Sequence, residues 1–159
     1  MRIALLLVVL AGGAGGLMLA GPRPPAPIPP VAAPSAKPTP AVATVERHAG
    51  GHFIGIAEVN GHPVRFIVDT GASTVALTPE DARAAGLAVD PSRWSHVGRS
   101  ATGDARGERL TLASLSIGGV RRMDVSAAVV EGLPVSLLGQ SFLRRLDAVE
   151  IHGDLMTLR

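Results

Sequence analysis

The chain has 159 residues, with 15 Lys or Arg, 13 Asp or Glu and no cysteine. The lack of cysteine excludes disulfides, thiolate–zinc sites and a cysteine nucleophile. Residues 44–159 hold 12 Arg against 13 acidic residues, and the chain has one Trp and no Tyr, so no basic, aromatic face for nucleic acid is expected.

The amino terminus carries an uncharged segment, residues 3–20, followed by a proline-rich stretch. The uncharged run has the length of a short membrane-spanning helix, so residues 1–20 are expected to be a signal anchor or transmembrane segment. A cleavable signal peptide is the alternative. Residues 21–43 hold nine of the 13 prolines and are expected to form an extended linker. This order predicts a single-pass membrane protein whose domain, residues 44–159, is exported across the membrane. Cleavage would instead release the exported domain.

The first part of the domain is expected to form short strands joined by turns. A strand-like run from Phe53 to Val59 ends at Asn60-Gly61, a strong hairpin signal, and Val64–Val68 returns as the second strand. Thr74–Leu77 follows as a third short strand. The segment Thr78–Gly86 then has the pattern of a short helix, because it has an N-cap residue, a proline in its first turn and a glycine at its end.

The second part of the domain starts with a polar, glycine-containing segment, residues 87–107. Apolar patterning then predicts strands and one further short helix. The expected strands are Leu110–Ile117, Val120–Val129, an apolar Val135–Leu138, Ala148–Ile151 and Leu155–Leu158, with one or two helical turns over Gln140–Leu146. The sum is an all-β domain with two short helices. Strands and helices do not alternate, which argues against a parallel nucleotide-binding fold.

One motif, Asp69-Thr70-Gly71, has the residue types of a catalytic site. An apolar strand, Phe66–Val68, runs directly into Asp69, Thr70 and Gly71. A carboxylate at the end of a buried strand is costly unless it is used or paired, and the glycine lets the backbone bring its amides close to it. Asp69 is therefore the candidate catalytic residue, and Thr70, Gly71 and Ala72 form its loop. A strand-ending turn capped by Asp is the alternative interpretation.

A second apolar segment, Leu137–Leu143, places Leu138 and Gly139 at the start of a short helix, 70 residues after Asp69. Together the two motifs resemble the retropepsin-like aspartic proteases, and in particular the single-domain, membrane-anchored bacterial members. The resemblance covers about residues 50–159 and implies a closed-barrel acid-protease half-fold that functions as a homodimer. It also implies a single-pass protein of a bacterial inner membrane with the domain in the periplasm, or a periplasmic or secreted domain if the amino-terminal segment is cleaved. Three further segments support it: Gly51-His52-Phe53, Val59-Asn60-Gly61 and Ile151-His152-Gly153-Asp154-Leu155.

The resemblance implies an aspartic endopeptidase that hydrolyses peptide bonds. Two carboxylates, one ionised and one protonated, hold a water molecule in such enzymes, which are the standard case of this proton sharing. The chain has a single Asp-Thr-Gly, so the second carboxylate must be the partner subunit's Asp69. In the family, Thr70 would lie beneath the dyad and bond across the dimer, while Gly71 supplies close backbone approach. The expected partners are a second copy of the chain and a protein or peptide substrate, with no cofactor and no metal.

The family also needs a hairpin flap that covers the peptide. The candidate is Arg99–Ala105, with Thr102 and Gly103 at its tip, because glycine allows the backbone to turn and move. An ordinary surface loop is the alternative. One departure concerns Gly139, which is followed by Gln140-Ser141 where viral relatives have a Gly-Arg-Asn type of sequence. The arginine of the viral sequence helps to lock the viral dimer. This chain lacks it at that position, so the strength of a dimer here is left open.

Other side chains are given ordinary structural roles. His48 and His52 are four residues apart, but Gly50-Gly51 between them disfavours the helix that would place both on one face. No zinc site is therefore expected. Trp94, the single tryptophan, is expected in the core rather than in the cleft.

An alternative function belongs to another class: a non-catalytic, membrane-anchored peptide-binding or assembly module on the same fold. The intact Asp-Thr-Gly favours the enzyme, because a site that had lost its catalytic activity would have no chemical reason to retain Asp69. The polar flap and the absent arginine favour the binding module. Turnover that depends on Asp69 would distinguish the two.

Overall fold

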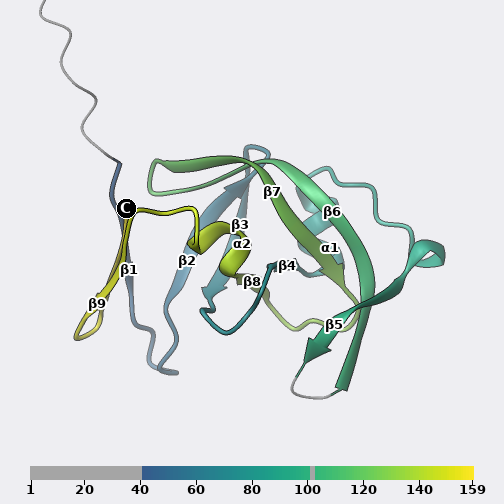
Figure 1. Cartoon of the computed structure of the whole chain (residues 1–159), viewed down its shortest axis with the longest axis horizontal. Helices are drawn as coiled ribbons and strands as arrows, with labels where there is room; N and C mark the ends of the chain where they lie inside the picture. Colours follow the sequence, from purple (N-terminus) through teal and green to yellow (C-terminus); the bar gives the residue numbers. More distant parts are fainter. Residues whose placement is uncertain (1–40, 101–102) are drawn as a thin grey trace, which may run out of the picture. The chain divides into compact units, whose positions relative to one another are not determined.

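A computed structural model describes residues 41–100 and 103–159 of the chain (Figure 1). The anchor predicted over residues 1–20, most of the linker predicted over residues 21–43, and Thr102 lie outside the described residues. The described residues belong to the compact unit Pro38–Arg159. Among them, no helix combines the length and the apolar character needed to cross a membrane.

Short strands dominate the part of the chain that the structure describes. The strands are β1 (Ala43–Glu46), β2 (Ile54–Val59), β3 (His62–Val68), β4 (Val75–Leu77), β5 (Ser95–Ser100), β6 (Gly103–Ile117), β7 (Val120–Val130), β8 (Ser136–Leu138), β9 (Val149–His152) and β10 (Leu155–Leu158). The helices are α1 (Pro79–Ala84) and α2 (Gln140–Leu143), and η1 (Pro91–Arg93) is a single 3₁₀ turn.

Six of the strands close into a barrel. Their order is β2-β3-β8-β4-β7-β6, and β2 pairs with β6 to complete the circle. β3 runs parallel to β8 and β4 runs parallel to β7, whereas β4 and β8 are antiparallel. β5 adds to the outer edge of β6, and β1, β10 and β9 form a separate three-stranded sheet. The predicted all-β closed barrel with two short helices is confirmed. The single chain does not show the homodimer.

Two hairpins turn at dipeptides with positive φ angles, and the first of these dipeptides, Asn60-Gly61, was predicted from the sequence. Asn60 and Gly61 have φ angles of 51° and 88°, and Gly118 and Gly119 have φ angles of 53° and 85°. Positive φ at both central residues gives the two-residue turn whose twist matches that of the flanking strands. The side-chain Oδ1 of Asn60 also accepts a hydrogen bond from the backbone N–H of Ser114 at 3.0 Å. This bond ties the β2–β3 hairpin to β6.

Helix α1 begins where it was predicted, and a buried serine fixes its start. Thr78 Oγ1 accepts a hydrogen bond from the backbone N–H of Asp81 at 3.0 Å, and Pro79 occupies the first turn. The hydroxyl of Ser136 is fully buried; it donates to Asp81 Oδ2 at 2.5 Å and accepts from the backbone N–H of Thr78 at 3.1 Å. The strand predicted over Val135–Leu138 forms as β8, but its description as apolar is wrong at Ser136, whose buried hydroxyl has both a donor and an acceptor at the helix start.

Replacing Ser136 by alanine should destabilise the domain without changing its shape. The change removes one oxygen and leaves the Asp81 carboxylate and the Thr78 N–H without their buried partner, so the free energy of unfolding should fall by about 1–3 kcal/mol. Urea denaturation measures this loss. Ser95→Ala, at an exposed serine of β5, is the matched control and should be nearly neutral. Equal stability of the two variants would contradict the role assigned to Ser136.

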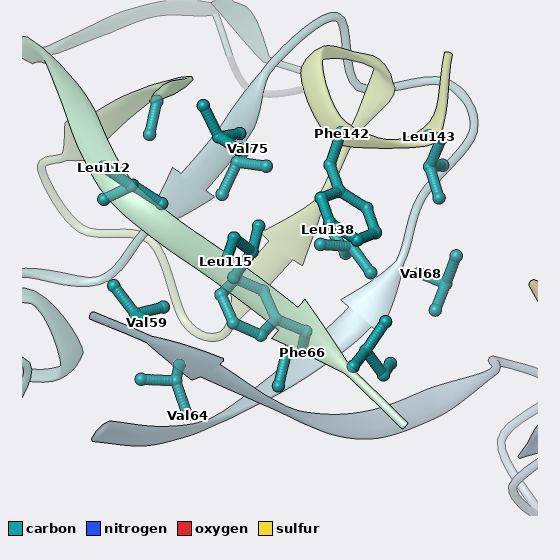
Figure 2. Close-up of a cluster of buried hydrophobic side chains, with 14 of the residues drawn as sticks. Val59, Val64, Phe66, Val68, Val75, Leu112, Leu115, Leu138, Phe142 and Leu143 are labelled. Atoms are coloured by element: carbon teal, nitrogen blue, oxygen red, sulfur yellow. The ribbon is translucent and has the colours of Figure 1, made fainter. Parts of the chain in front are cut away.

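The hydrophobic core fills the barrel and the space beneath α2 (Figure 2). Phe66 of β3, Leu115 of β6 and Leu138 of β8 are completely buried. Phe142 of α2 is also completely buried, and its ring lies beside Leu138 in Figure 2. This packing fixes the ends of β3 and β8, which carry the two sequence motifs.

Three strand segments were not predicted from the sequence: β1, β5 and the first half of β6. β5 and the start of β6 are polar and rich in glycine, because their hairpin extends beyond the barrel and has little apolar surface to bury (Figure 1). β1 begins at Ala43, within the segment predicted as linker. Its alternate residues Ala43 and Val45 are 2% and 4% exposed, so this short strand covers the barrel.

The prediction that Trp94 lies in the core is wrong. Its side chain is half-buried and is not part of the core cluster. Trp94 follows the η1 turn at the start of the β5–β6 hairpin, outside the closed barrel. It also does not line the cleft beside Asp69.

Candidate active site

Asp69 is the first residue after β3, and its loop is closed by the carboxylate itself. The backbone N–H of Gly71 donates to Asp69 Oδ1 at 2.8 Å, and the backbone N–H of Ala72 donates to the Asp69 carbonyl at 3.3 Å. Asp69 is half-buried, whereas Thr70 and Gly71 are exposed. A Cβ atom at position 71 would lie 3.2 Å from Asp69 Oδ1, so glycine is the residue that lets this amide approach freely.

The second motif lies directly against the first. The carbonyl of Leu138, the last residue of β8, accepts from the backbone N–H of Asp69 at 3.1 Å. Gly139 is the N-cap of α2, and a Cβ atom there would overlap the Thr74 carbonyl and lie 2.8 Å from the Ala72 carbonyl oxygen. Leu138 and Gly139 therefore support the Asp69 loop by close backbone contact, although they follow it by about seventy residues.

Gln140 contributes contacts that the sequence analysis did not predict. Its backbone N–H donates to the carbonyl of Ala72 at 2.8 Å. Its side-chain Nε2 donates to the carbonyl of Thr70 at 2.9 Å. The residue was noted in the sequence only as a departure from the viral pattern. Its position directly after Gly139 was the available signal, because a residue there begins a helix that faces the loop.

Hydroxyl groups hold the far side of the loop, and these residues were also missed. Ser141 Oγ accepts from the backbone N–H of Val75 at 2.9 Å and donates to the carbonyl of Ser126 at 2.6 Å. Thr74 Oγ1 donates to the same carbonyl at 3.0 Å. The loop after Asp69, helix α2 and strand β7 are thereby joined. Hydroxyl side chains are common enough in loops that the sequence did not distinguish these.

A cleft of about 480 Å³ opens beside Asp69. One wall is the Asp69 loop, and the opposite wall is the β5–β6 hairpin, through Val97, Gly98, Arg99 and Ala105. The remaining lining is apolar and comes from the barrel and the segment before β8: Ala76, Ala128, Val130, Leu133 and Leu137. The cleft thus combines a carboxylate at its edge with apolar surface able to take an uncharged side chain.

Of the segment predicted as a flap, Arg99 and Ser100 at the end of β5 pair with Asp104 and Gly103 at the start of β6, and residues 101–102 lie outside the described residues. Gly103 is the first residue of β6 and has a φ angle of 127°, but it does not line the cleft. The hairpin residues that reach the cleft lie nearer its base. There, Arg109 Nη2 donates to the carbonyl of Val97 at 2.6 Å, and an ion pair joins Arg93 to Glu108. The role of the hairpin as a flap stays a prediction.

The turn that leads into this hairpin has a stabilised acidic cap. Hydrogen bonds from the side chain and the backbone N–H of Ser92 hold the pKa of Asp90 below its ordinary value. Asp90 is the N-cap of η1 and lies outside the cleft. No group of three or more His, Asp or Glu side chains suited to hold a metal ion occurs within residues 41–100 and 103–159.

Comparison with known sequences finds a matching family model and two curated relatives. The family model described as “gag-polyprotein putative aspartyl protease” matches residues 56–145, which include both motifs. A Sinorhizobium sp. protein described as an uncharacterized protein in the cobV 5′ region is 37% identical over 119 residues, which are 72% of this chain and 50% of that protein. The chain spans about half the length of the curated relatives that it matches.

Comparison with solved structures finds the same fold. The crystal structure of a retropepsin-like aspartic protease from Rickettsia conorii matches with a TM-score of 0.61 and 35% identity, over 74% of this chain and 88% of that one. EIAV protease, complexed with the inhibitor HBY-793, matches with a TM-score of 0.50 and 21% identity, over 62% of this chain and 91% of that one. At 21% identity the second likeness concerns the fold alone.

Proposed function

Because the chain belongs to the retropepsin-like aspartic proteases, we propose that it is an aspartic endopeptidase and that it acts as a homodimer. The observation that carries the proposal is the half-buried Asp69 carboxylate, which an ordered loop presents at the edge of an apolar cleft. A carboxylate in this position can take a proton from a water molecule. The substrate is a protein or peptide with an uncharged side chain that enters the cleft.

The chemistry needs a second carboxylate. The other aspartates of the chain are not followed by Thr-Gly or Ser-Gly, so the second group is the partner subunit's Asp69. Two carboxylates so close share one proton, as is well established for aspartic proteases. The ionised one takes a proton from water while the water oxygen bonds to the peptide carbonyl carbon, and the protonated one gives its proton to the carbonyl oxygen. The diol then collapses: the carboxylate that is now ionised takes a proton from one diol hydroxyl, the C–N bond breaks, and the amine nitrogen takes the proton of the other carboxyl, which leaves the dyad again with one shared proton.

Attachment to a membrane is a separate part of the proposal. The uncharged segment at residues 3–20 supports a signal anchor, with the proline-rich segment as the spacer to the domain. Such an anchor would confine two copies to one membrane plane and raise their effective concentration, which favours the dimer. The location proposed for the domain is the periplasmic side of a bacterial inner membrane.

The proposal is tested by peptide cleavage at several protein concentrations. The full chain in detergent micelles is incubated with a diverse peptide mixture, and products are identified by mass spectrometry. A dimeric enzyme should give more turnover per protein as its concentration rises through the dimer dissociation constant, and a hydroxyl-bearing mimic of the hydrated peptide bond should block it. A dimeric sample that retains peptides but leaves them uncut would instead establish the binding module.

A further inference from the structure

We infer that Gln140 is a positioning residue that orients the peptide group facing the Asp69 carboxylate. Its side-chain amide does so within each protomer, from the start of α2. The consequence for catalysis rests on the proposed function, whereas the consequence for loop order does not. Two hydrogen bonds, one on each side of the peptide group between Thr70 and Gly71, connect Gln140 to Asp69.

The two bonds involved meet at one peptide group. Gln140 Nε2 donates to the carbonyl of Thr70 at 2.9 Å. The next amide along the chain, Gly71 N–H, donates to Asp69 Oδ1 at 2.8 Å. The carbonyl of Thr70 and the N–H of Gly71 belong to the same planar peptide unit, and in a trans peptide they point in opposite directions. This peptide is therefore held between the amide of Gln140 on one side and the carboxylate of Asp69 on the other.

This arrangement has two physical effects on the carboxylate. A donor on the carbonyl polarises the peptide, which strengthens the hydrogen bond that its N–H makes to Asp69 Oδ1. It also opposes rotation of the peptide, which would turn the N–H away from the carboxylate. The loop needs such support, because Thr70 and Gly71 are exposed and glycine has wide backbone freedom.

The side chain of Gln140 can be changed without removing the other supports of the loop. The backbone N–H of Gln140 bonds to the Ala72 carbonyl whatever the side chain, and Asp69 N–H still bonds to the carbonyl of Leu138. Gln140 is half-buried rather than part of the core. A substitution that removes only the side-chain donor therefore tests the hydrogen bond rather than the fold.

The test compares side chains of similar length that do or do not carry a donor. Gln140→Met lacks the donor, Gln140→Glu places an acceptor against the Thr70 carbonyl, and Gln140→Lys keeps an N–H donor. The full chain in micelles is used for each, and amide hydrogen exchange at Gly71 is read by NMR. Exchange should be faster by about ten-fold in the Met and Glu variants and return near the wild-type rate in the Lys variant. This readout needs no turnover.

The second readout is the steady-state kinetics of peptide cleavage. Because the hydrogen bond acts on Asp69 rather than on the substrate, kcat should fall by about ten-fold in the Met and Glu variants, with KM nearly unchanged. Gln140→Lys should recover kcat. A rise in KM with kcat unchanged would overturn the assignment, since it would mean that Gln140 binds the peptide.

The two readouts separate this inference from the proposed function. Unchanged Gly71 exchange in Gln140→Met and Gln140→Glu overturns the positioning role. Equal behaviour of the Lys and Met variants also overturns it, because packing rather than the donor would then matter. Faster exchange in a protein whose wild type cuts no peptide supports the positioning role and contradicts the proposed enzyme.

Discussion

Asparagine in place of Asp69 is expected to abolish peptide cleavage and leave the fold intact. Asparagine has almost the same shape and keeps an oxygen that can accept from the Gly71 amide, which donates to Asp69 Oδ1 at 2.8 Å. It cannot take a proton from water or share one with a second carboxyl. Because both subunits lose their carboxylate at once, turnover should fall by at least about three orders of magnitude. Mass spectrometry of a peptide mixture measures the loss.

Mixing wild-type chains with Asp69→Asn chains tests whether the site is shared between two subunits. If a mixed dimer has one carboxylate and is inactive, an equimolar mixture that exchanges subunits should keep only about a quarter of its dimers in the active form. Its activity should then be well below the half expected from dilution. Residual activity of one half would show that each chain acts alone, and wild-type turnover in Asp69→Asn itself would rule out the dyad.

Alanine in place of Gly139 is expected to destabilise the domain strongly and to disturb the loop of Asp69. The added methyl group would overlap the Thr74 carbonyl and lie 2.8 Å from the Ala72 carbonyl oxygen, both on the loop that follows Asp69. Backbone atoms cannot move aside cheaply, so the free energy of unfolding should fall by about 3 kcal/mol. The φ angle of Gly139 is −100°, which any residue adopts, so the effect is steric and not conformational.

A matched substitution isolates that steric effect. Gly50→Ala adds the same methyl group at a turn where the nearest atom would be His52 Cδ2 at 3.9 Å, an ordinary contact. Urea denaturation should find Gly50→Ala close to wild type and Gly139→Ala strongly destabilised. Cleavage by Gly139→Ala should also be reduced more than its folded fraction accounts for, because the clash displaces the loop of Asp69. Equal midpoints for the two variants would contradict the close approach of the two motifs.

The local features of this protein could be predicted from its sequence. Asn60-Gly61 and the helix start at Thr78 behave as predicted, because each depends on a few neighbouring residues and their backbone preferences. The apolar pattern predicted the barrel strands for the same reason, since alternation reports burial on one face. Where that pattern is absent, in β5 and the start of β6, the strands were missed.

The sequence by itself therefore determined the all-β class, the turns and the position of the candidate carboxylate at the end of a strand. Only the tertiary structure decided what surrounds that carboxylate. Gln140 reaches the Thr70 carbonyl and Ser141 the Val75 N–H from 70 and 66 residues away. Such contacts produce no periodic pattern in the amino-acid sequence, because they depend on how the barrel brings β8 beside β3. The physical reason is that hydrogen bonds between distant segments are chosen by chain topology, whereas strands and turns are chosen by neighbouring residues.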